Sequence, residues 1–168
     1  GHRGHFLSDD LSEQMGIFAL LPQVLAAVKL PVIAAGGIAT AECIRSAMSL
    51  GASGVQIGTS YLLCDEAKTS ALHRTALQSE AAQHTALTNL FSGRPARGIV
   101  NRVMRELGAI RQDAPGFPNA GTWITPLRTA AEQQGLSDFT PLWSGQNTQG
   151  CQSIGAFDLT QQLIRAFD

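Results

Sequence analysis

The sequence lacks several features that would place it in a specialised class of protein. Its 168 residues contain no uninterrupted apolar run of about 18 residues, which argues against a membrane-spanning helix. Charged residues make up only 15% of the chain, the formal net charge is −1, and no basic run predicts a nucleic-acid surface. The chain begins without an initiator methionine or an apolar signal segment.

Cysteine is also scarce. The three cysteines, Cys43, Cys64 and Cys151, are an odd number at wide and irregular spacing. They predict neither a disulfide framework nor a zinc site, and they fit a reducing compartment, so we expect a cytoplasmic protein. A hydrophobic share of 44% indicates a globular chain and not a disordered one.

The first sixty residues alternate helix and strand signals. After a polar segment over 1–16, Pro22 is suited to open a helix, and a β-branched apolar run over 30–35 then predicts a strand buried on both faces. Thr40 is a suitable N-cap for the next helix, and Gly51 is suited to end it. A second apolar run over 54–59 then predicts a second strand. This order predicts a right-handed βαβ unit in a parallel sheet.

The remaining chain is mixed and predominantly helical. We expect a helical segment over 66–84, a strand over 85–91, a polar connection over 92–98, a helix over 99–107, a loop over 109–125, a helix from Pro126 to about 134, and a final helix over 156–167. In the final helix, Leu159, Leu163, Ile164 and Phe167 recur on one face and are expected to pack on the core.

The two strand ends are the best candidate for a ligand site. Gly36 and Gly37 follow the first strand, and Gly58 and Thr59 follow the second. Glycines let backbone N–H groups approach an anion, Thr59 adds a hydroxyl, and a helix begins just after Thr40. For either site alone a tight turn is the favoured explanation, but the pair in this order favours a phosphate cradle.

Other polar residues leave alternatives open. His2 and His5 lie in a Gly-rich segment, where spacing alone favours a solvated histidine over a catalytic base, and no cluster of residues has metal-ligand spacing. Arg94 and Arg97 are suited either to binding an anion or to holding a loop in place, and the structural role is favoured. The turn at 143–146 would bring Gln146 to a ligand.

These motifs together resemble the nitronate monooxygenase family, formerly called 2-nitropropane dioxygenases. The matching segments are 1–4, 21–24, 31–38, 54–59, 91–102, 126–131 and 142–146. The resemblance implies an α/β fold, the C-terminal part of an FMN-binding (β/α)8 TIM barrel with a mostly helical substrate-side insertion. It divides the chain into final barrel units (1–76), a substrate-side region (77–140) and a return segment with a packing helix (141–168).

The resemblance also implies a function. Enzymes of this family hold FMN and oxidise alkyl nitronates, such as propionate 3-nitronate, with dioxygen to a carbonyl compound and nitrite. His2 would bind the nitro group or act as the catalytic base. Cofactor contacts carry over to the following residues: Gly36, Gly37, Gln56, Gly58, Thr59, Ser144, Gly145 and Gln146. A whole barrel needs about 250 residues, so we expect the intact protein to supply the missing N-terminal half.

Three other functions fit some of the same residues. A flavin-dependent enoyl-(acyl carrier protein) reductase shares the glycine-rich strand ends but would use NAD(P)H. A flavin- or phosphate-binding module without catalysis would keep the cradle and not need His2. A phosphosugar or aldolase-like barrel would also bind phosphate, but the sequence has no lysine on a predicted strand for a Schiff base.

Overall fold

The computed structural model describes residues 10–168, which form two compact units. Unit 1 consists of Ser12–Thr69 and Gly145–Asp168, and unit 2 consists of Ser70–Ser144 with Asp10 and Leu11. Within the described range, no helix combines the length and the apolar character that crossing a membrane would need.

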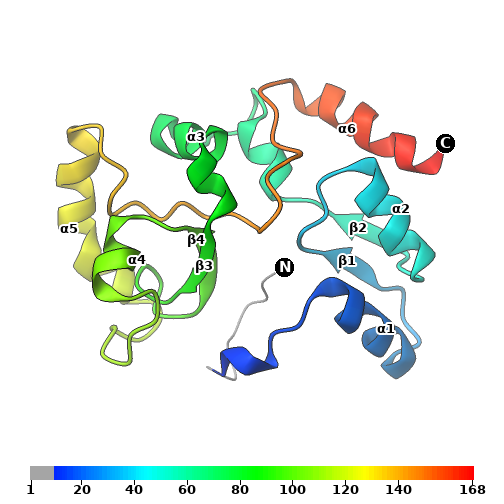
Figure 1. Ribbon diagram of the computed structural model, residues 1–168, viewed down its shortest axis with the longest axis horizontal. Helices are drawn as coiled ribbons and strands as arrows, with labels where there is room; N and C mark the ends of the chain where they lie inside the picture. The colour runs from blue at the N-terminus through cyan, green and yellow to red at the C-terminus, as the bar shows by residue number, and fades with distance from the viewer. Residues whose placement is uncertain (1–9) are drawn as a thin grey trace. The chain divides into compact units, whose positions relative to one another are not determined.

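Unit 1 contains the predicted βαβ arrangement (Figure 1). Its elements are η1 (Leu11–Glu13, shared with unit 2), α1 (Ile17–Ala27), β1 (Ile33–Ala35), α2 (Ala41–Ser49), β2 (Gly54–Gln56), η2 (Thr59–Leu63), α6 (Ala156–Ile164) and η4 (Arg165–Phe167). The strands β1 and β2 are parallel, with Ile33 opposite Gly54 and Ala35 opposite Gln56. The expected order of helix, strand, helix and strand is therefore confirmed.

Helix α2 begins and ends at the residues that its sequence indicates. The Thr40 hydroxyl accepts a hydrogen bond from the backbone N–H of Cys43 at 3.3 Å, which satisfies one of the free donors of the first turn. Gly51 follows the helix with a φ of 104°, a conformation that favours glycine. Both predictions are confirmed.

Helix α1 begins earlier than predicted. It starts at Ile17, so Pro22 lies inside the helix instead of opening it. Proline has no N–H to donate to the carbonyl one turn earlier, which normally weakens a helix. The Gln23 side chain donates to the Ala19 carbonyl at 2.8 Å, and Leu21 is buried in the core. Packing of the helix therefore offsets the missing hydrogen bond.

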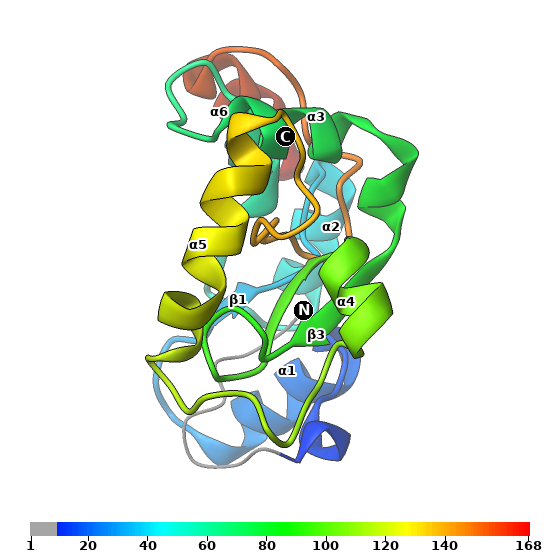
Figure 2. The same cartoon turned by 90° about the vertical axis from the view of Figure 1, so that its left-hand side faces the viewer.

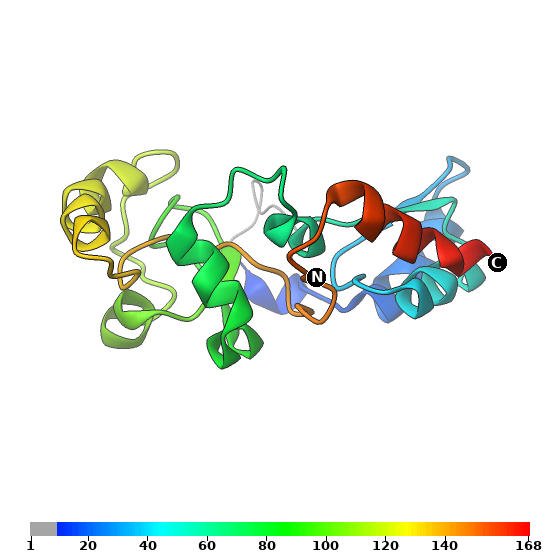
Figure 3. The same cartoon turned by 90° about the horizontal axis from the view of Figure 1, so that it is seen from above.

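The core of unit 1 covers only one face of the strand pair. Ala34 is buried together with Ile44 of α2 and Leu159 of α6, and Figure 3 shows α2 and α6 running side by side. Ile33 is 58% exposed, so the prediction of a strand buried on both faces is wrong for these residues. A sheet of two strands leaves one face uncovered by its own helices.

The C-terminal helix packs on the core with fewer residues than predicted. Phe167 is 65% exposed and Ile164 is 44% exposed, so these two residues do not pack on the core as expected.

Unit 2 is built on an antiparallel strand pair with helices around it (Figure 2). Its elements are α3 (Ala71–Gln78), η3 (Glu80–Gln83), β3 (Thr85–Thr88), β4 (Ala96–Ile99), α4 (Arg102–Leu107) and α5 (Ala120–Gln133). The expected helical segment over 66–84, the strand over 85–91 and the helix over 99–107 are confirmed in type, with shorter bounds. Strand β4 replaces part of the expected polar connection, and α5 begins in the expected loop.

Strand β4 forms because it has partners on both sides. Thr85 pairs with Ile99 and Thr88 with Ala96, and Gly98 forms a bridge with Trp143 on the other edge. A Cβ atom at Gly98 would lie 2.9 Å from the carbonyl oxygen of Leu142, so only glycine permits this approach. Partners distant in sequence therefore decide the conformation of a segment that reads locally as a polar turn.

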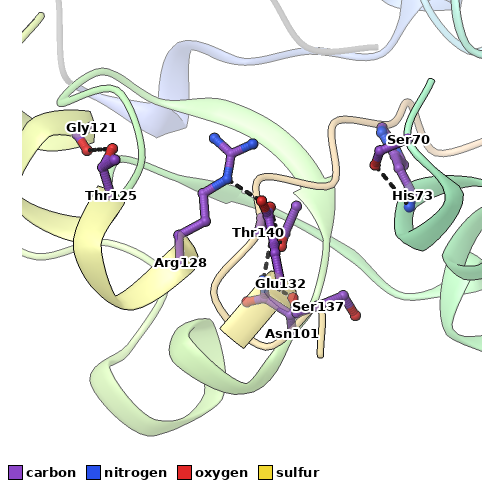
Figure 4. A network of polar contacts seen from close by, with 9 residues as sticks. All are labelled: Ser70, His73, Asn101, Gly121, Thr125, Arg128, Glu132, Ser137 and Thr140. Carbon is purple, nitrogen blue, oxygen red and sulfur yellow. Dashed lines mark hydrogen bonds and ion pairs between the residues drawn. The ribbon is translucent and has the colours of Figure 1, made fainter. Parts of the chain in front are cut away.

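A polar network joins the helices of unit 2 (Figure 4). The buried Asn101 caps α4 by accepting from the N–H of Met104, and its Nδ2 donates to the Thr140 carbonyl at 2.9 Å. The Thr140 hydroxyl donates to Glu132 at 2.8 Å, and Glu132 also forms an ion pair with Arg128 at 2.7 Å. The loop at 137–140 is thereby held to both α4 and α5.

His73 of α3 is half-buried. Its Nε2 lies 3.0 Å from the Trp143 carbonyl oxygen, and the Trp143 ring packs edge-on against Phe91. Burial lowers the pKa of the imidazole below its ordinary value of 6.5, and the carbonyl opposes this only partly. The imidazole is therefore neutral at pH 7 and donates from Nε2. His84, by contrast, is exposed.

We expect Gly150→Ala to destabilise the fold by about 1–3 kcal/mol, because overpacking at a buried site forces neighbouring atoms to move. A Cβ atom at this buried glycine would lie 2.2 Å from the carbonyl oxygen of Ala39 and 2.6 Å from the Ser60 hydroxyl. Urea unfolding measures the loss. Gly116→Ala is the matched control, since no atom lies within 4 Å of the place where its methyl group would stand. Equal stability of both variants would contradict the prediction.

We expect the free energy of unfolding to fall as the pH drops below the ordinary histidine value of 6.5, and to be insensitive to His73 above it. The folded chain has the lower His73 pKa, so the unfolded chain takes up the proton first and is favoured by acid. His73→Gln keeps an N–H donor for the Trp143 carbonyl and removes the titration. Urea unfolding at about pH 7.5 and 5.5 should show a smaller acid loss in the variant. An equal loss would exclude His73 as the group responsible.

Candidate functional site

The strand ends of unit 1 bring the predicted glycines together. Because Ala35 lies opposite Gln56 in a parallel pair, the chain leaves both strands at the same edge. Gly36 and Gly37 follow β1 with φ angles of 101° and 75°, a left-handed conformation that favours glycine. Gly58 follows β2 and directly precedes η2. The predicted proximity of the two segments is confirmed in the fold.

These strand ends present free backbone donors. Within residues 10–168, no acceptor is found for the N–H groups of Gly37, Ile38, Gly58 or Thr59. No atom lies within 4 Å of the place where a Cβ would stand on Gly37 or on Gly58, so the space beside both glycines is open. Several N–H groups around open space form the kind of concavity that binds an anion.

The Thr59 hydroxyl links the second strand end to the segment at 145–151. Its Oγ1 accepts a hydrogen bond from the N–H of Gly145 at 2.9 Å, so its own proton is directed elsewhere. The Thr59 carbonyl accepts from the Cys151 thiol at 3.3 Å. Burial raises the pKa of Cys151 to about 11, so this donor keeps its proton at neutral pH. Thr59 therefore holds the segment while its hydroxyl proton stays available to a ligand.

Asn147 joins the same segment to the first strand end. Its Nδ2 donates to the carbonyl oxygen of Gly37 at 3.1 Å, and its Oδ1 accepts from the N–H of Gln149 at 3.1 Å. Asn147 is not among the contacts predicted from the sequence, and its only local signal is the position directly after the predicted contact residue Gln146. Contact with Gly37 depends on the fold, which brings the two positions together.

The start of α2 adds a preference for negative charge. The pKa of the exposed Glu42 carboxyl is lowered, first by its own backbone N–H and then by the Thr40 hydroxyl. The pKa of the Cys43 thiol is lowered as well, mainly by the same hydroxyl. Both shifts favour the anionic form, as the N-terminus of a helix does. The helix begins shortly after Gly36 and Gly37.

Unit 1 contains most of the predicted cofactor contacts. The following predicted residues lie together in unit 1: Gly36, Gly37, Gln56, Gly58, Thr59, Gly145 and Gln146. Ser144 belongs to unit 2, where it is buried and its N–H donates to the Arg97 carbonyl at 3.2 Å. The predicted catalytic His2, together with His5, lies outside the described residues.

Arg97 has a structural contact, in agreement with the favoured prediction. Its Nη1 donates to the carbonyl and to the hydroxyl of Thr85, both at 3.2 Å, and so ties β4 to β3. Burial lowers the pKa of the guanidinium. Arg94 lies in the turn before β4, where its N–H and carbonyl both bond the Ser92 hydroxyl.

Comparison with known proteins identifies the family of this chain. The family model described as nitronate monooxygenase matches residues 1–166. A nitronate monooxygenase from Pseudomonas aeruginosa is 39% identical over 165 residues, which are 98% of this chain and 47% of that protein. The chain spans about half the length of the curated relatives it matches, with coverages of 47%, 48% and 47% for three of them.

Solved structures agree with this result. A nitroalkane oxidase from Streptomyces ansochromogenes matches with a TM-score of 0.81 and 36% identity, over 91% of this chain and 45% of that one. FabK from Thermotoga maritima matches with a TM-score of 0.73 and 24% identity, over 92% of this chain and 49% of that one. This match supports the fold alone. The predicted fold class, the C-terminal part of a barrel enzyme, is confirmed. The chain belongs to the nitronate monooxygenase family.

Proposed function

We propose that the strand ends of unit 1 hold the phosphate of FMN, and that the whole protein uses this cofactor to oxidise alkyl nitronates with dioxygen to a carbonyl compound and nitrite. The family supports oxidation of nitronates in general. The single observation that carries the cofactor proposal is the group of unpartnered N–H donors, within the described residues, around the open space beside Gly37 and Gly58.

The residues at the strand ends fit a phosphate group. A phosphate monoester carries about two negative charges at neutral pH and accepts several hydrogen bonds. Gly37, Ile38, Gly58 and Thr59 offer backbone N–H groups, and Thr59 adds its hydroxyl proton. The N-terminal end of α2 adds partial positive charge. A neutral ligand would leave these donors poorly satisfied.

The remaining residues take supporting roles in this proposal. FMN, when bound, supplies the electron-transfer chemistry that no amino-acid side chain provides. Gln56 stands exposed at the end of β2, where its carboxamide is suited to hydrogen-bond the flavin. Ser144, Gly145 and Gln146 would line the cofactor side of the return segment. His2 would bind the nitro group or remove a proton from a neutral nitroalkane.

The proposal also assigns a role to each region of the chain. Residues 1–76 supply the last barrel units with the phosphate site, residues 77–140 the substrate side, and residues 141–168 the return segment and a packing helix. The remaining strands of the barrel, which a family member needs to close its sheet, would come from the rest of the whole protein.

Gly58→Ala should weaken FMN binding at least about tenfold, equivalent to ~1.4 kcal/mol, without changing stability. Gly58 has a φ of −110°, which alanine adopts freely, and no protein atom stands where the methyl group would be. The methyl group would instead occupy the space proposed for the phosphate. Flavin fluorescence measures the dissociation constant, and urea unfolding measures the stability.

Gly16→Ala is the matched control for this test, because it also adds a methyl group to open space, at the N-cap of α1 and outside both glycine segments. It should bind FMN as the unmodified chain does. Unchanged FMN affinity in Gly58→Ala would contradict the placement of the phosphate at this strand end.

The reaction is tested with the whole purified flavoprotein. Addition of propionate 3-nitronate should consume dioxygen and release nitrite, and anaerobic NADH should leave the flavin bands unchanged, because the proposed reaction takes its electrons from the nitronate. Rapid bleaching of the flavin by NADH, without nitrite release, would instead indicate the flavin-dependent enoyl-(acyl carrier protein) reductase. Nitrite release that persists in His2→Ala would remove His2 from the proposed mechanism.

A further inference from the structure

We propose that Asn147 is a positioning residue for the phosphate cradle, which it aligns through the carbonyl of Gly37. This inference rests on the proposed function. The relevant contact is the hydrogen bond from Asn147 Nδ2 to the Gly37 carbonyl oxygen at 3.1 Å. The two residues are far apart in sequence and come from the return segment and the end of β1.

The peptide bond explains how this contact acts on a ligand. The carbonyl of Gly37 and the N–H of Ile38 belong to one planar trans peptide and point in opposite directions. Holding the carbonyl therefore also sets the direction of the N–H. That N–H has no acceptor within residues 10–168, and Ile38 is only 7% exposed. A free backbone N–H beside open space is suited to an anionic ligand, so a bound acceptor is its expected partner.

The glycine pair makes such a constraint necessary. Gly36 and Gly37 both have positive φ angles, in a region that glycine enters and leaves easily. Without a further contact, the peptide planes at the end of β1 would be free to rotate. Asn147 supplies that contact, and because the constraint comes from outside the turn, it does not occupy the donors that face the ligand.

Asn147 is itself held in place. Its Oδ1 accepts from the N–H of Gln149 at 3.1 Å, which fixes the rotamer of the carboxamide and assigns its nitrogen to Gly37. Before Asn147 in the sequence, the N–H of Gly145 donates a hydrogen bond to the Thr59 hydroxyl. After Asn147, the Cys151 thiol donates a hydrogen bond to the Thr59 carbonyl. The segment at 145–151 thus connects the two strand ends, and Asn147 is its contact with the first one.

The test compares binding of FMN with binding of riboflavin, which lacks the phosphate, to the whole protein by flavin fluorescence. In Asn147→Ala we expect the preference for FMN over riboflavin to fall about three- to tenfold, the effect of one lost hydrogen bond. Riboflavin affinity should stay unchanged. If Asn147 had a merely structural role, its replacement would weaken the binding of both ligands alike.

Asn147→Asp gives a second measurement, because aspartate has nearly the same shape but no N–H and carries a negative charge. We expect Asn147→Asp to weaken FMN binding more than Asn147→Ala does and to leave riboflavin binding unchanged. Asn119→Ala is the control, since Asn119 is an exposed asparagine without a side-chain capping bond, and its ligand preference should match the unmodified chain.

The outcomes separate this inference from the function on which it rests. If the unmodified chain binds riboflavin as tightly as FMN, the phosphate cradle itself is wrong, and the role of Asn147 with it. If the unmodified chain prefers FMN and both Asn147 variants keep the full preference, only the inference about Asn147 is overturned.

Discussion

The parallel pairing of β1 and β2 is the constraint on which the rest of unit 1 depends. It places Ala35 opposite Gln56, so both strands end at one edge of the sheet and both glycine segments leave in the same direction. Past the last pair of the ladder, backbone N–H groups lose their strand partners. In this chain they are not paired by other protein groups within the described residues, and they surround open space.

Close backbone approach is the second recurring feature of the structure. Gly150 lies against the Ala39 carbonyl, Gly98 against the Leu142 carbonyl, and Gly93 against the backbone N–H of Phe117. In each case a Cβ atom would stand closer than 3.0 Å to a backbone atom. The return segment and the turn before β4 therefore depend on glycine because no side chain fits, which is independent of any contact with a ligand.

Two helices show how packing overrides a local signal. Pro22 and Pro126 both favour a helix start, yet α1 and α5 run through them. Near Pro126, the Thr125 hydroxyl donates to the Gly121 carbonyl at 2.6 Å, and near Pro22 the Gln23 side chain donates to the Ala19 carbonyl at 2.8 Å. These bonds reach the adjacent carbonyls and not those of Phe18 and Thr122, which lose the N–H donor at the prolines. The prediction failed because packing, which a sequence pattern does not specify, decides where these helices begin.

The sequence by itself determined the features that depend on neighbouring residues. These include the cap at Thr40, the helix end at Gly51, the order of the βαβ elements and the glycines at 36–37 and 58, because local hydrogen bonding and backbone freedom are set within a few positions. Tertiary structure alone decided strand β4, the exposed face of β1, the half-burial of His73 and the contact of Asn147 with Gly37. Each of these depends on a partner, or on the lack of one, at a distant position in the chain, and such pairings arise only when the chain has folded.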